Sequence, residues 1–261
     1  MSEARFTGER LPGTDPTHYA VDLERHLAAY RWVATRAAGR RVLDAGCGEG
    51  YGTALLAERA RMVVGIDRPE PVGVATARYR APNLEYRVAD LERLDGLGER
   101  FDLVVSCQVI EHLPDPVGFL RGLLAVTAAG GEIVVTTPNR LMSVSENPYH
   151  LREWTAPELL ALAAPVLPGA RVLGVHGSER VLAYERARGA QVQRILRLDP
   201  LGLRRLLPEA VVKGAFAFFS GVVRRRIRSE GALPAVGPED FRVGDDALDQ
   251  ALDLLLLAQA P

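Results

Sequence analysis

Features that would point to a secreted, metal-binding or membrane protein are scarce in this sequence of 261 residues. It contains only two cysteines, Cys47 and Cys107, and their spacing matches neither a disulfide framework nor a zinc site. No apolar run reaches the ~18 residues of a membrane span, and the charged N-terminus lacks the apolar run of a secretory signal. The 32 Lys and Arg nearly cancel the 33 Asp and Glu, so no charge excess suggests nucleic acid or an anionic membrane as a partner. We therefore expect a cytoplasmic protein without a membrane span.

Short apolar runs alternate with helical patterns along most of the chain. Seven runs bounded by turn residues are predicted strands, at residues 41–45, 62–66, 84–89, 101–106, 132–137, 171–175 and 252–258. Amphipathic or helical patterns predict helices at residues 22–38, 53–59 and 117–128. A further helix should begin after Thr155, a favourable N-cap residue, with Glu158 in its first turn. Apolar strands that alternate with helices predict an α/β fold, a doubly wound, mostly parallel, Rossmann-like seven-stranded sheet.

One long segment does not follow this alternation. Residues 177–246 read as helices rich in Leu and Arg, with several prolines between them, which predicts a helical insertion before the last strand. The chain then has four expected parts: an N-terminal helical segment (1–40), an α/β core (41–176), the insertion (177–246) and the last strand (247–261).

Acidic residues follow three of the predicted strands. Asp44, Asp67 and Asp90 stand at or just beyond their carboxyl ends. In an open parallel sheet, ligands bind beyond this edge of the strands. We therefore expect these three carboxylates to lie close to one ligand.

A glycine-rich stretch, "RVLDAGCGEGYG", follows the first of these acids. A dinucleotide-binding loop would need a third small residue after Gly46 and Gly48, and Tyr51 and Thr53 occupy those positions instead. The carboxylate of Asp44 would also repel a phosphate and favour a cationic ligand. A ligand with an ammonium group, a ribose and an adenine but no phosphate fits this pattern better, and S-adenosylmethionine is such a molecule.

Five segments together carry a resemblance to a known family. "VLDAGCGEGYG", "VVGID", "VADLERL", "FDLVVSCQVIEHLPDP" and "GGEIVVTTPNR" resemble, in order and spacing, the class I S-adenosylmethionine-dependent methyltransferases. The resemblance covers about residues 41–140. It implies that S-adenosyl-L-methionine is the cofactor and S-adenosyl-L-homocysteine the product, with residues 1–40 as a lid and residues 177–246 as a cap over the methyl acceptor.

The resemblance also implies a role for each matching position. The methionine part of the cofactor would be held by Asp44 and by the backbone of Gly46, Gly48 and Gly50. The ribose hydroxyls would bind Asp67, whose two oxygens both accept hydrogen bonds. The remaining contacts would be Asp90 and the Leu91 backbone at the adenine edge, Arg68 beside the ring, and Cys107 and Gln108 near the sulfonium.

The flanking segments narrow the expected acceptor. "RFTGERLPG" and "NPYHLREWTAPEL" resemble a branch common in bacterial glycan and natural-product pathways, including actinobacterial sugar O-methyltransferases of methylmannose polysaccharide synthesis. We expect O-methylation of a sugar or oligosaccharide hydroxyl, with aromatic faces for the sugar ring from Tyr19, Tyr149, Trp154 and Tyr184. The alternatives are O-, N- or C-methylation of another small molecule, a nicotinamide-dependent dehydrogenase and a non-catalytic cofactor-binding protein. A homo-oligomer is compatible with the sequence.

The proposed base is a histidine. His150 lies in a polar loop after the fifth predicted strand, and an imidazole could take the proton of a hydroxyl acceptor. His112 is the second candidate, and either Glu111 or Glu153 could orient the imidazole. Both histidines could instead be structural. In the ubiquinone-pathway O-methyltransferases, which the chain also resembles, the pair matching Glu111 and His112 can border a divalent metal; since the sequence shows no third ligand, we assign no metal site.

Overall fold

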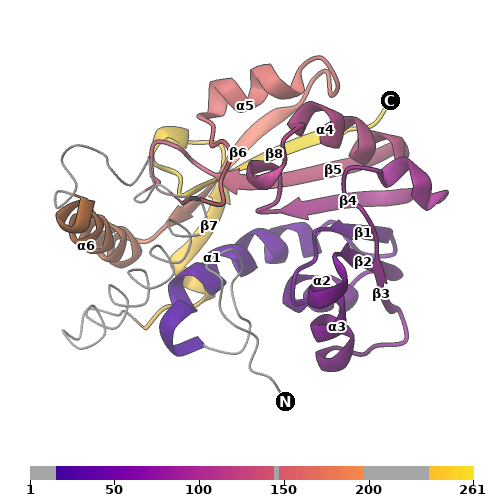
Figure 1. Ribbon diagram of the computed structural model, residues 1–261, viewed down its shortest axis with the longest axis horizontal. Helices are drawn as coiled ribbons and strands as arrows, with labels where there is room; N and C mark the ends of the chain where they lie inside the picture. Colours follow the sequence, from indigo (N-terminus) through magenta and orange to yellow (C-terminus); the bar gives the residue numbers. More distant parts are fainter. Residues whose placement is uncertain (1–15, 144–146, 197–234) are drawn as a thin grey trace.

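A computed structural model describes residues 16–143, 147–196 and 235–261 of the chain, and within them the strands form one sheet with the order β3-β2-β1-β4-β5-β8-β6-β7 (Figure 1). The strands are β1 (Arg41–Ala45), β2 (Met62–Asp67), β3 (Leu84–Val88), β4 (Phe101–Cys107), β5 (Thr127–Pro138), β6 (Arg171–Gly177), β7 (Phe241–Gly244) and β8 (Asp253–Gln259). The α-helices are α1 (Pro16–Ala34), α2 (Tyr51–Ala57), α3 (Pro69–Arg78), α4 (Pro116–Ala125), α5 (Ala156–Ala163) and α6 (Glu179–Leu196). Short 3-10 helices are η1 (Leu94–Leu97), η2 (Ile110–His112), η4 (Pro238–Asp240) and η5 (Leu248–Gln250).

The first five strands confirm the predicted parallel sheet. β1 pairs in parallel with β2 and β4, β2 with β3, and β4 with β5. β8 runs antiparallel to both β5 and β6. The carboxyl ends of β1, β2, β4 and β5 therefore share one edge with the start of β8, and the predicted site residues lie at this edge.

The prediction of seven strands is wrong by one, because the described residues form eight. The additional strand, β7, pairs antiparallel with β6 at the edge of the sheet. It belongs to residues 177–246, so this segment is not wholly helical, although α6 at its start is a helix. Residues 197–234 lie outside the described residues, and a cap over the acceptor remains a prediction.

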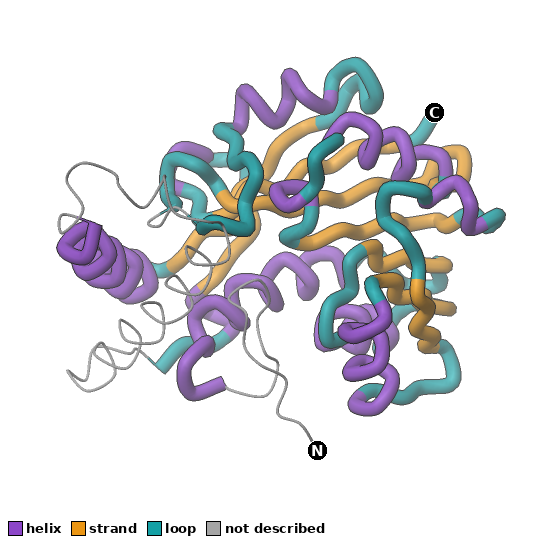
Figure 2. The backbone as a smooth tube through the Cα atoms, viewed as in Figure 1, coloured by secondary structure: helices purple, strands orange, loops and turns teal. Residues whose placement is uncertain are grey.

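Helices cover both faces of the sheet (Figure 2). On one face, α1 and α2 pack on alternate strand residues such as Val42, Val63 and Leu103. On the other face, α4 and α5 pack on residues such as Leu43 and Val104. Neighbouring residues of a strand point to opposite faces, so strands with both faces covered are apolar throughout.

The helices differ from the sequence expectation in their bounds and in one additional helix, α3. α1 begins at Pro16 and ends at Ala34, whereas its apolar pattern extends from residue 22 to 38. α3 was not predicted, because Pro69 and Pro71 in its first turn resemble a loop, although proline is well tolerated there. α4 ends at Ala125, and β5 starts two residues later. Among the described residues, none of the helices combines the length and apolar character needed to cross a bilayer.

Candidate active site

The glycine loop joins β1 to α2 in a conformation that most residues avoid. Gly46, Gly48 and Gly50 have φ values of +88°, +54° and +87°. The N–H groups of Gly46 and Cys47 both donate to the carbonyl of Ile66, at 2.8 and 3.0 Å, which ties the loop to the end of β2. A Cβ atom at Gly46 would lie 2.3 Å from the Val109 side chain, so glycine is required by space as well as by φ.

Asp67 is held against this loop by two backbone hydrogen bonds. Its Oδ2 accepts the N–H of Gly48 at 2.8 Å, and its Oδ1 accepts the N–H of Arg68 at 2.7 Å. A carboxylate has about four acceptor positions, so both oxygens can still accept hydrogen bonds from a ligand. This geometry suits a ligand with two neighbouring hydroxyls, as a ribose has.

Asp44 is fully buried at the end of β1 with neutral hydrogen-bond donors. Its carboxylate accepts the Thr53 hydroxyl at 2.7 Å and the Tyr30 hydroxyl at 3.2 and 3.3 Å. Burial raises the pKa of Asp44 to about 7, and the hydrogen bonds from Thr53 and Tyr30 offset only part of this effect. Because no described Lys or Arg forms an ion pair with it, an ammonium group of a ligand would supply the missing countercharge.

Tyr30 is a residue of this site that the sequence did not reveal. It comes from α1, and a Cβ atom at Gly52 would lie 2.1 Å from its ring, so α1 packs directly on the start of α2. The rings of Tyr30 and Tyr51 meet edge to face at 6.1 Å, and His26 Nδ1 lies 2.9 Å from the Tyr51 hydroxyl. These contacts place α1 over the glycine loop, as a lid would be, but nothing in the sequence pattern pairs Tyr30 with Asp44.

The predicted adenine-binding residues lie beside Asp67. The N–H of Ala89 donates to the Asp67 carbonyl at 3.1 Å, which brings the turn after β3 to the same edge. Asp90 is exposed there and accepts the N–H of Glu92 at 2.9 Å, so it also stabilises its own turn. Leu91 reaches the loop, with its Cδ1 3.5 Å from the position of a Cβ at Gly46. Arg68 is exposed at the start of α3.

The end of β4 brings two further predicted cofactor contacts, Cys107 and Gln108, to the same edge. Cys107 is buried, and burial raises the pKa of its thiol, so it lines the site as a neutral group. Gln108 has a φ of +56°, an uncommon conformation for a residue other than glycine. Its N–H donates to the Thr136 carbonyl at 3.0 Å, which fixes this backbone against β5.

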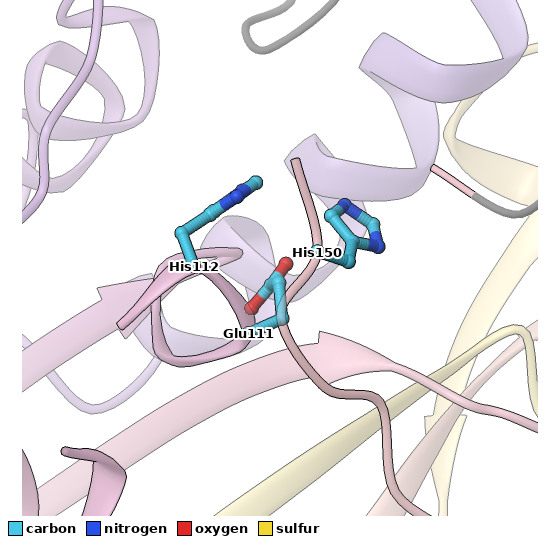
Figure 3. Close-up of side chains that lie close together, drawn as sticks. All are labelled: Glu111, His112 and His150. Carbon is cyan, nitrogen blue, oxygen red and sulfur yellow. The ribbon is translucent and has the colours of Figure 1, made fainter. Parts of the chain in front are cut away.

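Three predicted catalytic residues converge beyond β4 (Figure 3). One potential ligand atom from each of Glu111, His112 and His150 lies within 4.8 Å of the others, and His112 and His150 flank Glu111. The N–H of Leu151 donates to the Glu111 carbonyl at 2.8 Å, so the backbone holds the loop of His150 against η2. His150 thus supplies the third potential ligand atom, which the sequence did not show.

Glu111 is completely buried in this cluster. Its Oε2 accepts the Thr137 hydroxyl at 3.2 Å, and its Oε1 has no hydrogen-bond partner among the described residues. Burial raises the pKa of Glu111 to about 8, so its carboxyl group is mostly protonated at neutral pH.

Backbone and carboxylate groups orient the two histidines. His112 Nδ1 lies 2.8 Å from the Tyr149 carbonyl, so it carries the proton, and Nε2 carries the lone pair. His150 Nδ1 lies 2.5 Å from Glu153 Oε1, while its Nε2 lies 2.9 Å from the Asn147 amide nitrogen. Of the two acids considered for orienting His150, the structure therefore pairs it with Glu153.

The expected aromatic faces for a sugar ring are mostly wrong. Trp154 is 1% exposed and packs in the core between the sheet and α4 and α5. Tyr19 and Tyr184 are also buried, the latter beside α1 and β7. The rings of these three residues supply apolar area to the core instead. Only Tyr149 lies partly exposed in the loop of His150.

Comparison with known proteins finds a family model and relatives that are similar to the part of the chain that holds this site. A family model described as a methyltransferase domain matches residues 43–135. A probable S-adenosylmethionine-dependent methyltransferase of Mycolicibacterium smegmatis is 42% identical over 163 residues, which cover 60% of this chain and 62% of the relative. A ubiquinone biosynthesis O-methyltransferase of Pseudomonas fluorescens is 36% identical over 115 residues, covering 42% and 50% of the two chains.

A solved structure shares the fold across most of the chain. A putative methyltransferase from Bacillus halodurans aligns with a TM-score of 0.54 and 17% identity, over 90% of this chain and 98% of that one. The alignments with the two relatives span 62% and 50% of those relatives' own lengths. The matched residues 43–135 contain the glycine loop, Asp44, Asp67, Gln108 and Glu111, whereas His150 lies beyond them. Residues 43–135 are therefore similar to a methyltransferase domain.

Proposed function

We propose that the protein transfers the methyl group of S-adenosylmethionine to a hydroxyl of a sugar or oligosaccharide. The observation that carries this proposal is the cluster of Glu111, His112 and His150 at the sheet edge where the cofactor residues lie. A hydroxyl is a weak nucleophile at neutral pH, and its proton must leave as the new bond forms. An imidazole beside the methyl group would supply this function.

The cofactor residues have defined tasks in this reaction. Asp44 would pair with the ammonium group of the cofactor, and Asp67 would accept hydrogen bonds from the ribose hydroxyls. The acceptor oxygen attacks the methyl carbon while the bond from carbon to sulfur breaks, so the sulfonium becomes a neutral thioether. The protein contributes mainly by aligning oxygen, carbon and sulfur and by excluding water.

His150 is the proposed base. With Nδ1–H directed to Glu153, its Nε2 carries the lone pair that would receive the proton, and Glu153 would stabilise the resulting imidazolium. The Asn147 amide now donates to that lone pair, so the acceptor hydroxyl must take its place. His112 offers the same tautomer beside it and is the second candidate.

Three observations support a hydroxyl acceptor. O-methylation agrees with the name of the Pseudomonas relative, which is an O-methyltransferase. A hydroxyl-rich acceptor agrees with the buried acid Glu111 and with the polar loop around His150, both of which favour hydrogen-bond donors. The sugar itself rests on the resemblance of the flanking segments, and a phenolic or other small hydroxyl compound is the alternative.

A divalent cation also fits the cluster. The unpartnered Oε1 of Glu111 and two imidazoles are a donor set that suits zinc, manganese or iron. Glu111, His112 and His150 would hold such an ion, with the Tyr149 carbonyl and Glu153 orienting the imidazoles. A cation bound there would lower the pKa of an acceptor hydroxyl.

The test is an acceptor screen with labelled S-adenosylmethionine, run after chelation and again with added Mn²⁺ or Zn²⁺. The panel contains mannosides, glucosides and deoxysugars beside catechols, quinols and amines. Label on a sugar supports the proposal, and label on phenols or amines alone replaces it with the small-molecule alternative. Transfer that needs the added metal assigns the cluster to cation binding.

A further inference from the structure

We propose that Asp253 binds the methyl acceptor, with its Oδ1 accepting a hydrogen bond from a second hydroxyl next to the one that is methylated. This inference rests on the proposed hydroxyl acceptor and identifies a specificity residue on the opposite face of the sheet from Glu111. Arg25 acts as a positioning residue for Asp253.

Asp253 lies where the ligand edge meets the last strand. It is the first residue of β8 and pairs in register with Pro138, the last residue of β5. The residue before Pro138 is Thr137, whose hydroxyl binds Glu111. Because neighbouring residues of a strand point to opposite faces, the two buried carboxyl groups of Glu111 and Asp253 flank the end of β5.

Asp253 lies opposite Pro138 at the end of β5, close enough to Cys107 and Glu111 for its charge to affect both. Burial is the main cause of the raised pKa values of Cys107 and Glu111, and the negative charge of Asp253 adds to both. Burial raises the pKa of Asp253, and the positive charge of Arg25 offsets part of this rise. Asp253 therefore lies near residues of both groups, and the acceptor must lie between these groups to reach the methyl carbon.

The two oxygens of Asp253 have different surroundings. Oδ2 lies 3.0 Å from Arg25 Nε in an ion pair, whereas Oδ1 has no hydrogen-bond partner among the described residues. The residue is only 1% exposed. An unpartnered carboxylate oxygen in such a place is costly, and a hydroxyl of a ligand would satisfy it.

Acids outnumber bases in the buried network behind Asp253. Arg188 Nη1 lies 3.0 Å from Asp22 and 3.3 Å from Glu185, which link α1 to α6. Arg25 and Arg188 thus serve three buried acids, Asp22, Glu185 and Asp253. Within this network of described residues, the carboxylate oxygen without a hydrogen-bond partner is Oδ1 of Asp253. The methyl acceptor should therefore present a hydrogen-bond donor there and not an anionic group.

The experiment compares Asp253→Asn with the matched control Asp22→Asn, a second buried acid of the same network. Kinetics are measured with a methylated glycoside and with its monodeoxy analogues. For Asp253→Asn we expect KM for the parent glycoside to rise about 10–100-fold, the loss expected for a hydrogen bond to a charged group. The deoxy analogue that lacks the recognised hydroxyl should react equally well with wild type and with Asp253→Asn. The affinity of Asp253→Asn for the cofactor should equal that of wild type.

Two results would overturn the proposal. One is an equal loss of kcat/KM for the parent and all deoxy analogues, which would make Asp253 structural. The other is unchanged kinetics. If Asp253→Asn does not fold, Arg25→Lys is the second variant. It keeps a positive charge near Asp253 but shifts its position, so Asp253 is no longer held in place. KM should then rise for the parent glycoside and not for the deoxy analogue.

The proposed sugar acceptor can fail without removing this test. If only phenols are methylated, catechol replaces the glycoside and phenol replaces the deoxy analogue, and Asp253→Asn should remove the preference for catechol. Wild-type enzyme without a preference for the second hydroxyl contradicts the role of Asp253. If no acceptor is turned over, the glycosides are titrated by calorimetry into the protein saturated with S-adenosylhomocysteine. Absence of glycoside binding would contradict both the proposed sugar acceptor and the role of Asp253.

Discussion

The N–H of Gly48 donates a hydrogen bond to the carboxylate of Asp67 over 2.8 Å, which joins the loop after β1 to the end of β2. The same carboxylate also accepts the N–H of Arg68. The residue proposed to bind the ribose is therefore oriented before any ligand arrives. This preorganisation reduces the ordering that cofactor binding requires.

Asp67→Ala should weaken binding of both S-adenosylmethionine and S-adenosylhomocysteine by about 10–100-fold, because two ribose hydroxyls lose charge-assisted acceptors. Isothermal calorimetry measures both affinities. The control is Asp95→Ala, an exposed acid in η1. Equal affinities for wild type and the Asp67 variant would remove Asp67 from the cofactor site.

Cofactor affinity should depend on the ionisation of Asp44. Because the pKa of this buried acid is raised to about 7, it is mostly protonated below that pH in the cofactor-free protein. The ammonium of the cofactor requires the carboxylate, so affinity should fall by up to about tenfold per pH unit below pH 7. Asp44→Asn should bind weakly with a flat pH profile in calorimetry, and a wild-type profile that is also flat would contradict the pairing.

Stability should fall as the pH rises towards 8 in the absence of cofactor. The folded protein keeps protons on Asp44 and Glu111, with pKa values of about 7 and 8, after the unfolded chain has released them. The stabilisation is complete below the unfolded pKa values and is lost as the pH rises through the folded ones. Each group contributes a slope of up to about 1.4 kcal/mol per pH unit. Urea unfolding at a series of pH values measures the free energy of unfolding. Its decrease with pH should be shallower for Glu111→Gln than for wild type, and equal pH dependences would show that Glu111 is charged in the folded protein.

Removal of the proposed base should affect chemistry and spare cofactor binding. His150→Ala should reduce turnover about 10²–10⁴-fold while the affinity for S-adenosylmethionine stays nearly intact. Glu153→Gln should cause a smaller loss, because the imidazole remains but its Nδ1–H partner is neutral. If His150→Ala keeps near-normal turnover and His112→Ala does not, His112 is the base.

The contact of α1 with the loop can be tested at Gly52. Gly52→Ala should destabilise the protein by about 1–3 kcal/mol, because the new Cβ would lie 2.1 Å from the Tyr30 ring. Gly73→Ala in α3 is the matched control, since no atom lies within 4 Å of a Cβ there, and it should be neutral or stabilising. Denaturant unfolding compares the two, and similar stabilities would show that α1 does not pack tightly on the loop.

Local patterns predicted the backbone structure around the glycine loop. The strand, acid and glycines of residues 41–52 form a strand-turn-helix unit whose geometry depends on neighbours in sequence. The start of α5 was predicted for the same reason, because Thr155 and Glu158 form a capping box within one turn. Asp44 and Asp67 meet the loop because adjacent parallel strands end at one edge.

Contacts between distant segments could not be predicted. His150 joins Glu111 and His112 through a backbone hydrogen bond between loops, and Tyr30 reaches Asp44 from a helix whose register only packing determines. Trp154 was expected to offer its ring to a sugar, but the ring lies in the core, where packing between distant segments holds it. β7 was missed because four residues are too few to show a period.

The most direct test of the central claim is the position of the transferred methyl group. The protein is incubated with S-adenosylmethionine carrying a ¹³C-methyl group and with the best glycoside from the screen, and the product is examined by NMR. We predict a single enriched methyl signal bonded to one sugar oxygen, which Asp67→Ala and His150→Ala both suppress. An enriched methyl group on nitrogen or carbon, or transfer that His150→Ala and His112→Ala leave unchanged, would contradict hydroxyl activation by this cluster.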